Sequence, residues 1–467
     1  MFDDKKNRDL HDSRIKVTLF SDILPKQPNR NQFSDCDGDC DLPLDCDCDC
    51  ACSDKFAKPV SLSEPISYYL ELTPHCPNRC YGCGNVFADQ RTSNHLQKTM
   101  SFEHWKVILE KISISASFLR ITGGEPTLHP SFFDIIRIID DLKIPFALLT
   151  TGRWGNKRKI LQALSQNQSF QGFLISLHGP TSKVHEAFTG SVGSFNDAVD
   201  SIQMAVEMGF KVAVSTVMLG SNLQVFEETV RKAVSLGANH VVFGRYIGDD
   251  IPGLTLSASK IHEAISEVAR LEAEGYPVRF GNCIPQCFEP STSLGCTAGR
   301  TFCTIDPWGN VRPCNHAKVV VGNLLNTAVD SIWNSKKMLD WREAYNEACL
   351  SCAAFGQCRG GCKALYFDQA HRDPLMHVPF NQFTPVTTAH EIQLQSSSIP
   401  KREFVVREEI AGDFLVARGR AVNVTSDQLS FLNCVVDNYA LKDIQGEFGD
   451  EALSYLGKLY LEGYISF

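Results

Sequence analysis

Residues 66–83 have the sequence ISYYLELTPHCPNRCYGC, in which an apolar run leads directly into three cysteines. The run is rich in aromatic and branched residues, which favours a β-strand. The cysteines have the spacing C-x3-C-x2-C and therefore lie on the loop that follows this strand. In a barrel of parallel strands, the loops at the carboxyl ends carry the active site. We therefore expect a metal or cluster site at Cys76, Cys80 and Cys83.

Five more short apolar runs follow, and longer amphipathic stretches separate them. The expected strands are residues 66–72, 118–122, 146–150, 172–178, 211–219 and 239–247. The clearest helical periods are residues 102–112, 132–142, 195–208 and 225–236, with Ser101, Ser131 and Ser194 as expected N-caps. This alternation predicts an α/β fold, specifically a partial (β/α)6 TIM-like barrel over residues 64–280.

The composition is typical of a cytoplasmic protein with several domains. The chain has 467 residues, which exceeds the usual size of one domain. Its net charge of -9 disfavours a nucleic-acid partner. No apolar run approaches the roughly 20 residues of a membrane span, and the first residues are too polar for a signal peptide. Nineteen cysteines in a reducing compartment favour metal or cluster ligands over disulfides.

The remaining segments differ from the barrel in composition. Residues 1–60 are predicted to be a disordered tail, because its Asp/Cys tract at residues 35–54 has almost nothing to bury. That tract is either a solvated segment or a metal-binding one. Residues 281–375 are rich in cysteines and loops, and residues 376–400 are an expected linker. Residues 401–467 show three short strand patterns and then helical periods, the outline of a small winged-helix-like domain.

The second expected strand ends in the sequence GGEP, residues 123–126. From the residues alone, the three cysteines could hold zinc, although His75 is an awkward fourth ligand because it adjoins Cys76. They could also belong to an electron-transfer cluster with a fourth cysteine. The three-cysteine motif after the first strand and GGEP after the second together resemble the radical S-adenosylmethionine (SAM) superfamily.

The resemblance implies a catalytic [4Fe-4S] cluster on Cys76, Cys80 and Cys83, with one iron left open for SAM. Reductive cleavage of SAM would give methionine and a 5'-deoxyadenosyl radical. The glycines of GGEP would let the backbone approach SAM. The implied SAM contacts are Gly123, Gly124, Glu125, Pro126, Thr150, Thr151, Ser176 and His178. Two residues depart from the family pattern: Gly82 stands where an aromatic residue is common, and His178 stands where an aspartate is common.

A second group of cysteines begins with CTAGRTFCTIDPWGNVRPC, residues 296–314, and continues with CLSCAAFGQCRGGC, residues 349–362. These are too many thiols for one zinc ion. The spacing, with G-x4-C from Gly309 to Cys314, resembles the SPASM domain, an auxiliary iron-sulfur extension of radical SAM enzymes that modify peptides and proteins. The resemblance implies two auxiliary clusters. The first would use Cys296, Cys303, Cys314 and Cys362, and the second would use Cys349, Cys352 and Cys358.

This assignment leaves the second auxiliary cluster without a fourth cysteine. The next cysteine after Cys362 is Cys434, which is expected in a helical core. The alternatives for the missing ligand are Asp368, His371, Asp373 or an open iron. Cys283 and Cys287, in the sequence CIPQC, are expected to be buried structural thiols, with a substitute ligand or a catalytic thiol as the alternative.

The resemblance implies a radical SAM maturase that abstracts hydrogen from a ribosomally made precursor peptide and so crosslinks, excises or oxidises residues. Residues 401–467 resemble leader-recognition elements of such enzymes, which bind the leader as an added strand; a structural cap on the barrel is the alternative. Flavodoxin or ferredoxin would supply electrons. The alternative functions are a protein side-chain oxidase of the sulfatase-activating type and a non-enzymatic electron carrier or redox sensor. Four polar residues lie near expected strand ends and are either site residues or solvated loop residues: Arg153, His185, Arg245 and Tyr246.

Overall fold

The computed structural model describes residues 14–20, 59–87, 99–248, 250–289, 295–352, 354–367, 373–376 and 389–467. The Asp/Cys tract at residues 35–54 lies outside the described residues, as do Asp368 and His371. The predictions made for these residues therefore stay predictions.

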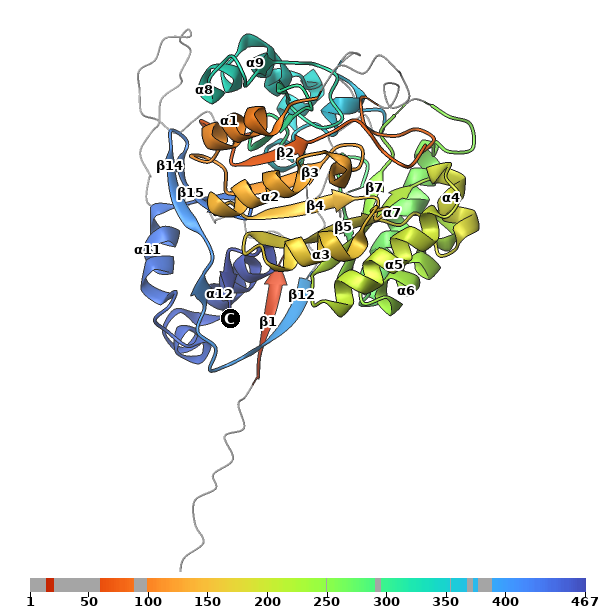
Figure 1. Cartoon of the computed structure of the whole chain (residues 1–467). Coiled ribbons are helices and arrows are strands. Elements are labelled where there is room, and N and C mark those ends of the chain that lie inside the picture. Colours follow the sequence, from red (N-terminus) through yellow and green to blue (C-terminus); the bar gives the residue numbers. More distant parts are fainter. Residues whose placement is uncertain are drawn as a thin grey trace, which may run out of the picture.

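A ten-stranded sheet forms the centre of the molecule (Figure 1), in the order β11-β10-β9-β2-β3-β4-β5-β6-β7-β8. The strands from β2 to β8 are parallel to their neighbours, and β9 is parallel to β2. Their bounds are β2 Ser67–Glu71, β3 Phe118–Thr122, β4 Phe146–Thr150, β5 Phe170–Ser176, β6 Val212–Met218, β7 His240–Arg245, β8 Val278–Phe280 and β9 Phe302–Ile305. The six predicted strands are confirmed, and β8 and β9 extend the partial barrel. A hairpin of β10, Asn310–Arg312, and β11, Gly322–Asn323, continues the sheet.

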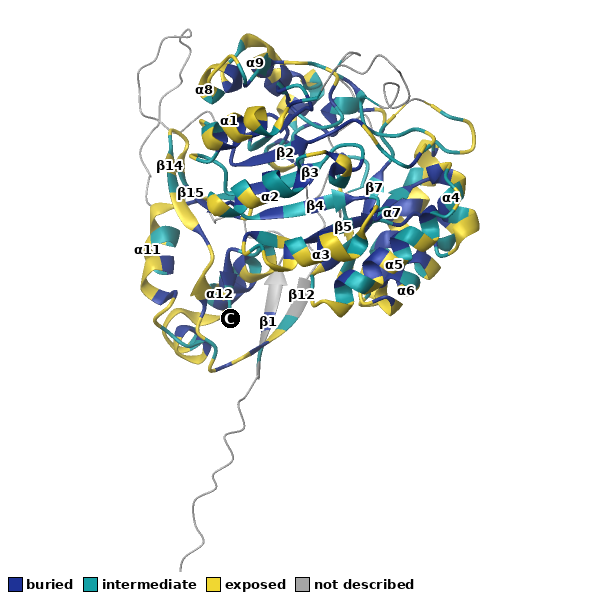
Figure 2. Cartoon of the chain, in the orientation of Figure 1, coloured by how far each residue is buried: buried dark blue, intermediate teal, exposed yellow. Residues whose placement is uncertain are grey.

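Seven helices cover the barrel strands (Figure 1): α1 Phe102–Ile112, α2 Phe132–Asp141, α3 Lys157–Ser165, α4 Ser182–Thr189, α5 Ser194–Glu207, α6 Phe226–Ser235 and α7 Ala258–Ala273. Each buries one apolar side, as the blue and yellow faces in Figure 2 show. The Ser101 hydroxyl caps α1 by accepting a hydrogen bond from the N–H of His104. The prediction for Ser194 is wrong, because Gly193 precedes α5 with a φ of 81°, which suits glycine alone. Among the described residues, we find no helix with the length and apolarity of a membrane span.

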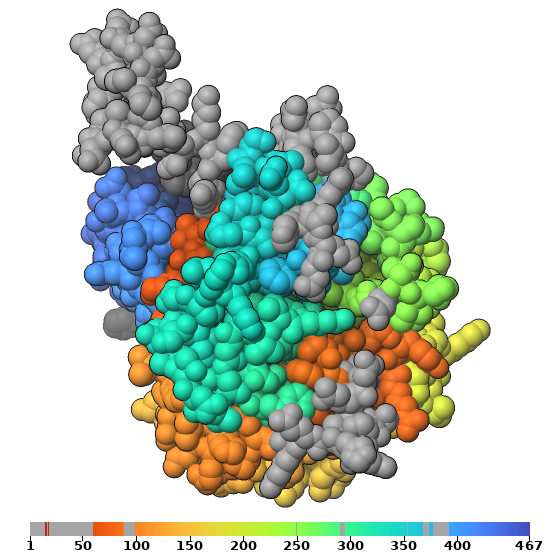
Figure 3. Space-filling view, turned by 90° about the horizontal axis from the view of Figure 1, so that it is seen from above, coloured from red at the N-terminus to blue at the C-terminus, as the bar shows by residue number. Residues whose placement is uncertain are grey.

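The cysteine-rich region contains three short helices, α8 Val329–Trp333, α9 Lys336–Glu343 and α10 Phe355–Cys358. Figure 3 shows most of it as one continuous area of surface beside the first barrel segments. A buried ion pair joins it to the barrel, since Arg312 of β10 contacts Glu71 of β2. Burial raises the pKa of Glu71 to about 7, although the Arg312 charge opposes this shift.

The C-terminal unit is a three-stranded antiparallel sheet followed by helices, as predicted. Its strands are β14 Val405–Glu409, β15 Gly412–Ala417 and β16 Arg420–Val424, and its helices are α11 Ser426–Val435 and α12 Leu441–Glu462. Thr425 and Gln428 form a capping box at the start of α11. Gly449 breaks α12 into two parts. The short strands β13, Lys401–Arg402, and β17, Ile465–Ser466, pair with each other.

Two segments that were predicted to lack structure pair with each other. Strand β1, Arg14–Phe20, runs antiparallel to β12, Ala389–Gln395. Val17 and Leu394 are buried in the core of the C-terminal unit. The prediction of a disordered tail and a linker is therefore wrong at these residues, because each strand finds its apolar contacts at the opposite end of the chain.

The C-terminal unit covers the amino-terminal end of the barrel strands. The N–H of Gly419, in the turn between β15 and β16, donates to the Ser117 hydroxyl at 3.1 Å. The apolar side chains Leu62, Ile66, Phe414 and Val416 form a small buried cluster between the unit and the start of β2. The unit therefore lies at the opposite end of the barrel from the cysteine loop that follows β2.

Candidate active site

The three-cysteine loop is bonded to the GGEP turn through its backbone. The N–H of Gly124 donates to the Thr73 carbonyl at 2.7 Å, and the N–H of Glu125 donates to the His75 carbonyl at 2.7 Å. These bonds fix the chain immediately before Cys76. The side chains of Cys76, Cys80 and Cys83 are half-buried, so the predicted cluster site is accessible from solvent.

Other barrel loops hold the rest of the cysteine loop. The Arg153 guanidinium donates to the Pro77 carbonyl at 3.3 Å and is itself anchored by Asp197 at 2.9 Å. Further along the loop, the N–H of Arg79 donates to the Thr189 carbonyl at 2.9 Å. Contacts from the loops after β3 and β4 and from the end of α4 therefore position this loop before any cofactor binds, which is the arrangement that a catalytic site requires.

The two glycines of GGEP make a close approach within the protein. Their expected contact with SAM stays a prediction. A Cβ on Gly124 would lie 2.6 Å from the Pro74 carbonyl oxygen and even closer to that of His75. Gly123 has a φ of 131°, which glycine adopts without strain. The glycines therefore allow the GGEP turn to lie directly against the cysteine loop.

Replacement of Gly124 by alanine should displace the cysteine loop and lower the stability by about 2 kcal/mol, the usual cost of overpacking. We also expect the loss of iron binding at this loop, since the loop must move away from the GGEP turn. Gly155→Ala is the matched control, because a Cβ there meets no atom within 4 Å. Thermal unfolding and iron content measure both effects. Equal values for the two variants would contradict the prediction.

Glu125 is a buried centre of hydrogen bonds at the strand ends. Its carboxylate accepts bonds from the Thr150 hydroxyl at 2.7 Å and from the N–H and hydroxyl of Thr151 at 2.8 and 2.7 Å. The Thr127 hydroxyl donates to its other oxygen at 2.7 Å. Burial raises the pKa of Glu125, and these hydrogen bonds oppose that shift. The predicted residues Glu125, Thr150 and Thr151 thus lie together and stiffen the site.

The predicted residues on β5 lie in different environments. Ser176 is half-buried at the end of the strand. The His178 ring is buried and stacks on His185 with 5.5 Å between ring centroids. Burial and the nearby His185 lower the pKa of His178 well below its usual range. Burial also lowers the pKa of His185 to about 4, so both rings stay neutral at physiological pH. His178 thus has a buried environment where the family has an aspartate.

The missing aromatic residue at position 82 has a replacement from another strand. Gly82 has a φ of 62°, and a Cβ there would lie 2.7 Å from two ring carbons of Tyr246. Tyr246 comes directly after β7. An aromatic ring from a residue distant in sequence therefore lies against Gly82, next to the third cysteine.

Cysteines of the second region gather in two groups, and the first includes Cys283, for which a structural thiol was the first expectation and a substitute ligand an alternative. The thiols of Cys296 and Cys362 lie close enough to the Cys283 thiol to be the main cause that raises its pKa well above the usual range. The Cys283 thiol is in turn the main reason why the pKa of Cys296 falls to about 6. Burial is the main cause that raises the pKa of Cys314, and the charges of Cys296 and Cys362 add to the rise. Cys314 therefore lies near these two residues.

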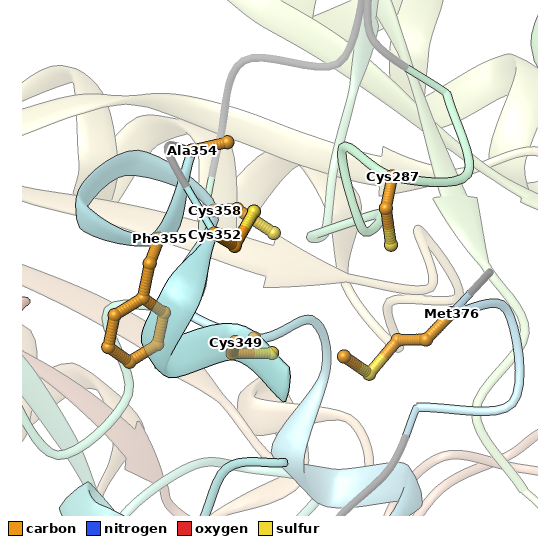
Figure 4. Close-up of a pocket in the computed structure, with 8 residues that line it drawn as sticks. Cys287, Cys349, Cys352, Ala354, Phe355, Cys358 and Met376 are labelled. Atoms are coloured by element: carbon orange, nitrogen blue, oxygen red, sulfur yellow. The ribbon is translucent and has the colours of Figure 1, made fainter. Parts of the chain in front are cut away.

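The second group lines an open cavity of about 260 Å³, a volume that includes the solvent at its mouth. Figure 4 shows that the cavity residues with sulfur are Cys287, Cys349, Cys352, Cys358 and Met376. Burial, followed by the charges of neighbouring cysteines, raises the pKa of Cys349 to about 12. Among the described residues, no three His, Cys, Asp or Glu side chains meet closely enough to hold a single metal ion. In a cubane, each thiolate binds a different iron, so the ligands surround a volume instead.

Two predicted ligands lie elsewhere. Cys303 is in β9 and is buried in the main barrel core. The adjacent Phe302 packs against the same small apolar cluster as Cys296 and Cys314, and successive side chains of a strand point to opposite faces. The structure therefore does not bring Cys303 to the first group. Asp373, offered as a ligand of the second cluster, is buried and bonded to Arg245 instead.

Comparisons with known proteins agree with these two cysteine regions. Residues 70–233 match the Radical SAM superfamily, and residues 296–358 match the iron-sulfur cluster-binding domain SPASM. The PqqA peptide cyclase of Rhodopseudomonas palustris is 25% identical over 66% of this chain and 86% of its own. The mycofactocin maturase MftC of Mycolicibacterium smegmatis is 27% identical over 66% of this chain and 80% of its own.

A relative of another kind is the AdoMet-dependent heme synthase of Methanosarcina barkeri, which is 24% identical over 61% of this chain and 90% of its own. Similarity over these domains alone therefore does not specify a substrate. The crystal structure of Streptococcus suis SuiB bound to the precursor peptide SuiA superposes with a TM-score of 0.58 at 16% identity, covering 68% of this chain and 77% of that one. This likeness shows the fold. The chain therefore contains a radical SAM domain over residues 70–233, the kind of domain that binds SAM and a [4Fe-4S] cluster, followed by a SPASM domain for auxiliary iron-sulfur clusters over residues 296–358.

Proposed function

We propose that this enzyme is a maturase of a ribosomally made precursor peptide. The observation that carries the proposal is the combination of the three-cysteine loop at one end of the barrel with a separate three-stranded unit at the other end. The PqqA peptide cyclase, MftC and the complex of SuiB with SuiA support a peptide substrate.

Cys76, Cys80 and Cys83 would hold the catalytic [4Fe-4S] cluster. With SAM bound and an electron from an external donor, this cluster would supply the radical chemistry that removes a hydrogen atom from the substrate. The buried carboxylate of Glu125 fixes the ends of β3 and β4 through the threonine hydrogen bonds. Arg153 ties the cysteine loop to the same strand ends. These residues keep the site rigid, and Tyr246 covers Gly82 beside the third cysteine. An electron donor such as flavodoxin or ferredoxin would act with the enzyme in the cytoplasm.

The C-terminal unit would bind the leader of the precursor as an added strand. Strands β14 and β16 are the two outer strands of its sheet, and strand addition uses an outer strand. Val405 and Ile410, within and just after β14, are exposed apolar side chains of the kind that a bound peptide covers. Backbone hydrogen bonds would give affinity, and these side chains would add contact area.

The position of this unit sets a minimum length for the precursor. The unit lies at the amino-terminal end of strands that are five to seven residues long, such as β2 and β5. At about 3.3 Å per residue, the peptide must span roughly 20 Å to reach the cysteine loop. We therefore expect turnover to stop when fewer than about six residues separate the leader from the modified residue. Mass spectrometry of precursors with shortened spacers measures this limit, and unchanged turnover without a spacer would contradict it.

The proposed function is tested by anaerobic reconstitution with iron, sulfide, SAM and dithionite. A precursor peptide encoded near this gene is then added. We expect 5'-deoxyadenosine in amounts that rise with the peptide and a mass change confined to the peptide. An electron carrier or redox sensor would give neither product, and that result would sink the proposal.

One observation favours a second candidate, a protein side-chain oxidase of the sulfatase-activating type. The C-terminal unit buries Leu62 and Ile66 of the barrel side, so it also serves as a structural cap. An enzyme of this second type has less need of a leader. Leader dependence therefore separates the two candidates.

A further inference from the structure

The segment from Cys283 to Cys287 lies between the two groups of cysteines and is firmly packed. Ile284 is buried in an apolar cluster with Ile265 of α7 and with Leu375. Pro285 lies against the chain at Gly361, where a Cβ would come within 3.0 Å of the proline ring. The segment is therefore held in place by apolar contacts on both sides.

At one end of the segment, Cys283 belongs to the first group. Its side chain is buried, and the neighbouring thiols of Cys296 and Cys362 dominate its electrostatic surroundings. Cys296 and Cys314 pack against the same small apolar cluster of Ala298, Ala317 and Trp341. Cys314 lies near Cys296 and Cys362, which makes four thiols in the group. Four cysteines are the usual ligand set of a [4Fe-4S] cluster. Cys303 is not needed for this set, and its side chain lies in the barrel core.

At the other end, Cys287 lines the cavity of the second group. Figure 4 shows its sulfur pointing into the space that it shares with Cys349, Cys352 and Cys358. The preceding residue also contacts this group, because the N–H of Gln286 donates a hydrogen bond to the Cys358 sulfur at 3.5 Å. Such a bond stabilises a thiolate and tunes the potential of a cluster that it holds.

Other candidates for the fourth position of the second group are less suitable. The Asp373 carboxylate accepts two bonds from the Arg245 guanidinium at 2.8 and 2.9 Å, and the N–H of Cys362 donates to it at 2.8 Å. Met376 lines the same cavity, but a thioether is a weaker ligand for iron than a thiolate. Cys287 is therefore the best-placed ligand.

We propose that the segment from Cys283 to Cys287 supplies one ligand to each auxiliary cluster. Cys283 completes the first with Cys296, Cys314 and Cys362, and Cys287 completes the second with Cys349, Cys352 and Cys358. The inference rests on the proposed auxiliary clusters. It implies that the two clusters are linked by three residues, so a shift of this segment alters both together.

The test uses the full chain with Cys76, Cys80 and Cys83 all replaced by alanine, so that only auxiliary clusters remain. After anaerobic reconstitution, this protein should hold about eight irons, four for each cluster. We expect Cys287→Ala to lower the iron content toward about four or to give a cluster with one labile iron, as seen by Mössbauer and electron paramagnetic resonance spectroscopy. Cys283→Ala should do the same at the other cluster, with a different spectrum.

Two matched variants serve as controls. Met376→Leu changes a residue that lines the same cavity as Cys287. Cys303→Ala removes the cysteine of β9. Both variants should keep the iron content and spectra of the parent protein. The inference is overturned if Cys287→Ala and Cys283→Ala match the parent, or if the two controls lose iron in their place. If the parent protein itself binds no iron, the chain has no auxiliary clusters. That result would contradict the proposed clusters themselves and, with them, the assignment of their ligands.

Discussion

Replacement of Cys80 by alanine should abolish SAM cleavage, lowering it about 10³-fold or more, because groups that act as a unit lose nearly all activity when one is removed. Cys80 lies on the loop whose backbone carbonyls accept hydrogen bonds from Gly124, Glu125 and Arg153. Without its thiolate, only Cys76 and Cys83 remain on this loop to hold the catalytic cluster. The measurements are 5'-deoxyadenosine formation with dithionite and iron content, which should fall by about four atoms.

Cys434→Ala is the control for this experiment, since Cys434 is exposed in the C-terminal unit, and the expectation that it lies in a helical core is wrong. It should keep the iron content and the activity of the unmodified enzyme. If Cys80→Ala cleaves SAM as well as Cys434→Ala does, the assignment of the catalytic cluster to this loop is wrong.

Removal of the leader from the precursor should lower the turnover of the peptide about 10²-fold at limiting concentration, because tethering raises the effective concentration of the segment to be modified. The chain itself is left unchanged in this experiment, so its folding is not in question. Leader peptide added separately should compete with the full precursor. Hydrogen exchange of the C-terminal unit should show new protection in β14 or β16, whichever strand receives the leader.

Deletion of residues 401–467 gives a second measure of the same dependence. We expect the deletion to abolish peptide turnover and to leave cleavage of SAM without peptide. Iron content and circular dichroism must be checked, since Leu62 and Ile66 lose their cover. Turnover that is equal with and without the leader, and that survives the deletion, would favour the side-chain oxidase.

The barrel and the catalytic motif were predictable from the sequence because their signals are local. A strand shows a period of two and a helix a period of 3.6 within about ten residues, so α1 is predicted at the observed bounds. The three-cysteine motif and GGEP each follow a strand directly. Parallel pairing then brings the ends of β2 and β3 together, and this rule needs no knowledge of other contacts.

The choice of cysteines in the second region was beyond the sequence. Cys303 has the expected position along the chain, but strand β9 turns it toward the core. Cys283 and Cys287 precede the recognised spacing and approach the other thiols only through folding. The pairing of β1 with β12 is hidden for the same reason, because its partners lie more than 360 residues apart.

The sequence by itself determined the six strand and helix units, the three-cysteine loop beside GGEP, and the presence of a second cysteine region and a C-terminal unit. Only the tertiary structure decided that Gly124 serves the cysteine loop, that Tyr246 covers Gly82 and that the C-terminal unit lies opposite the active site. Periodicity and spacing record which neighbours a residue has along the chain. Thiol grouping and close approach depend on the direction of each side chain and on partners from distant segments, which the three-dimensional packing sets.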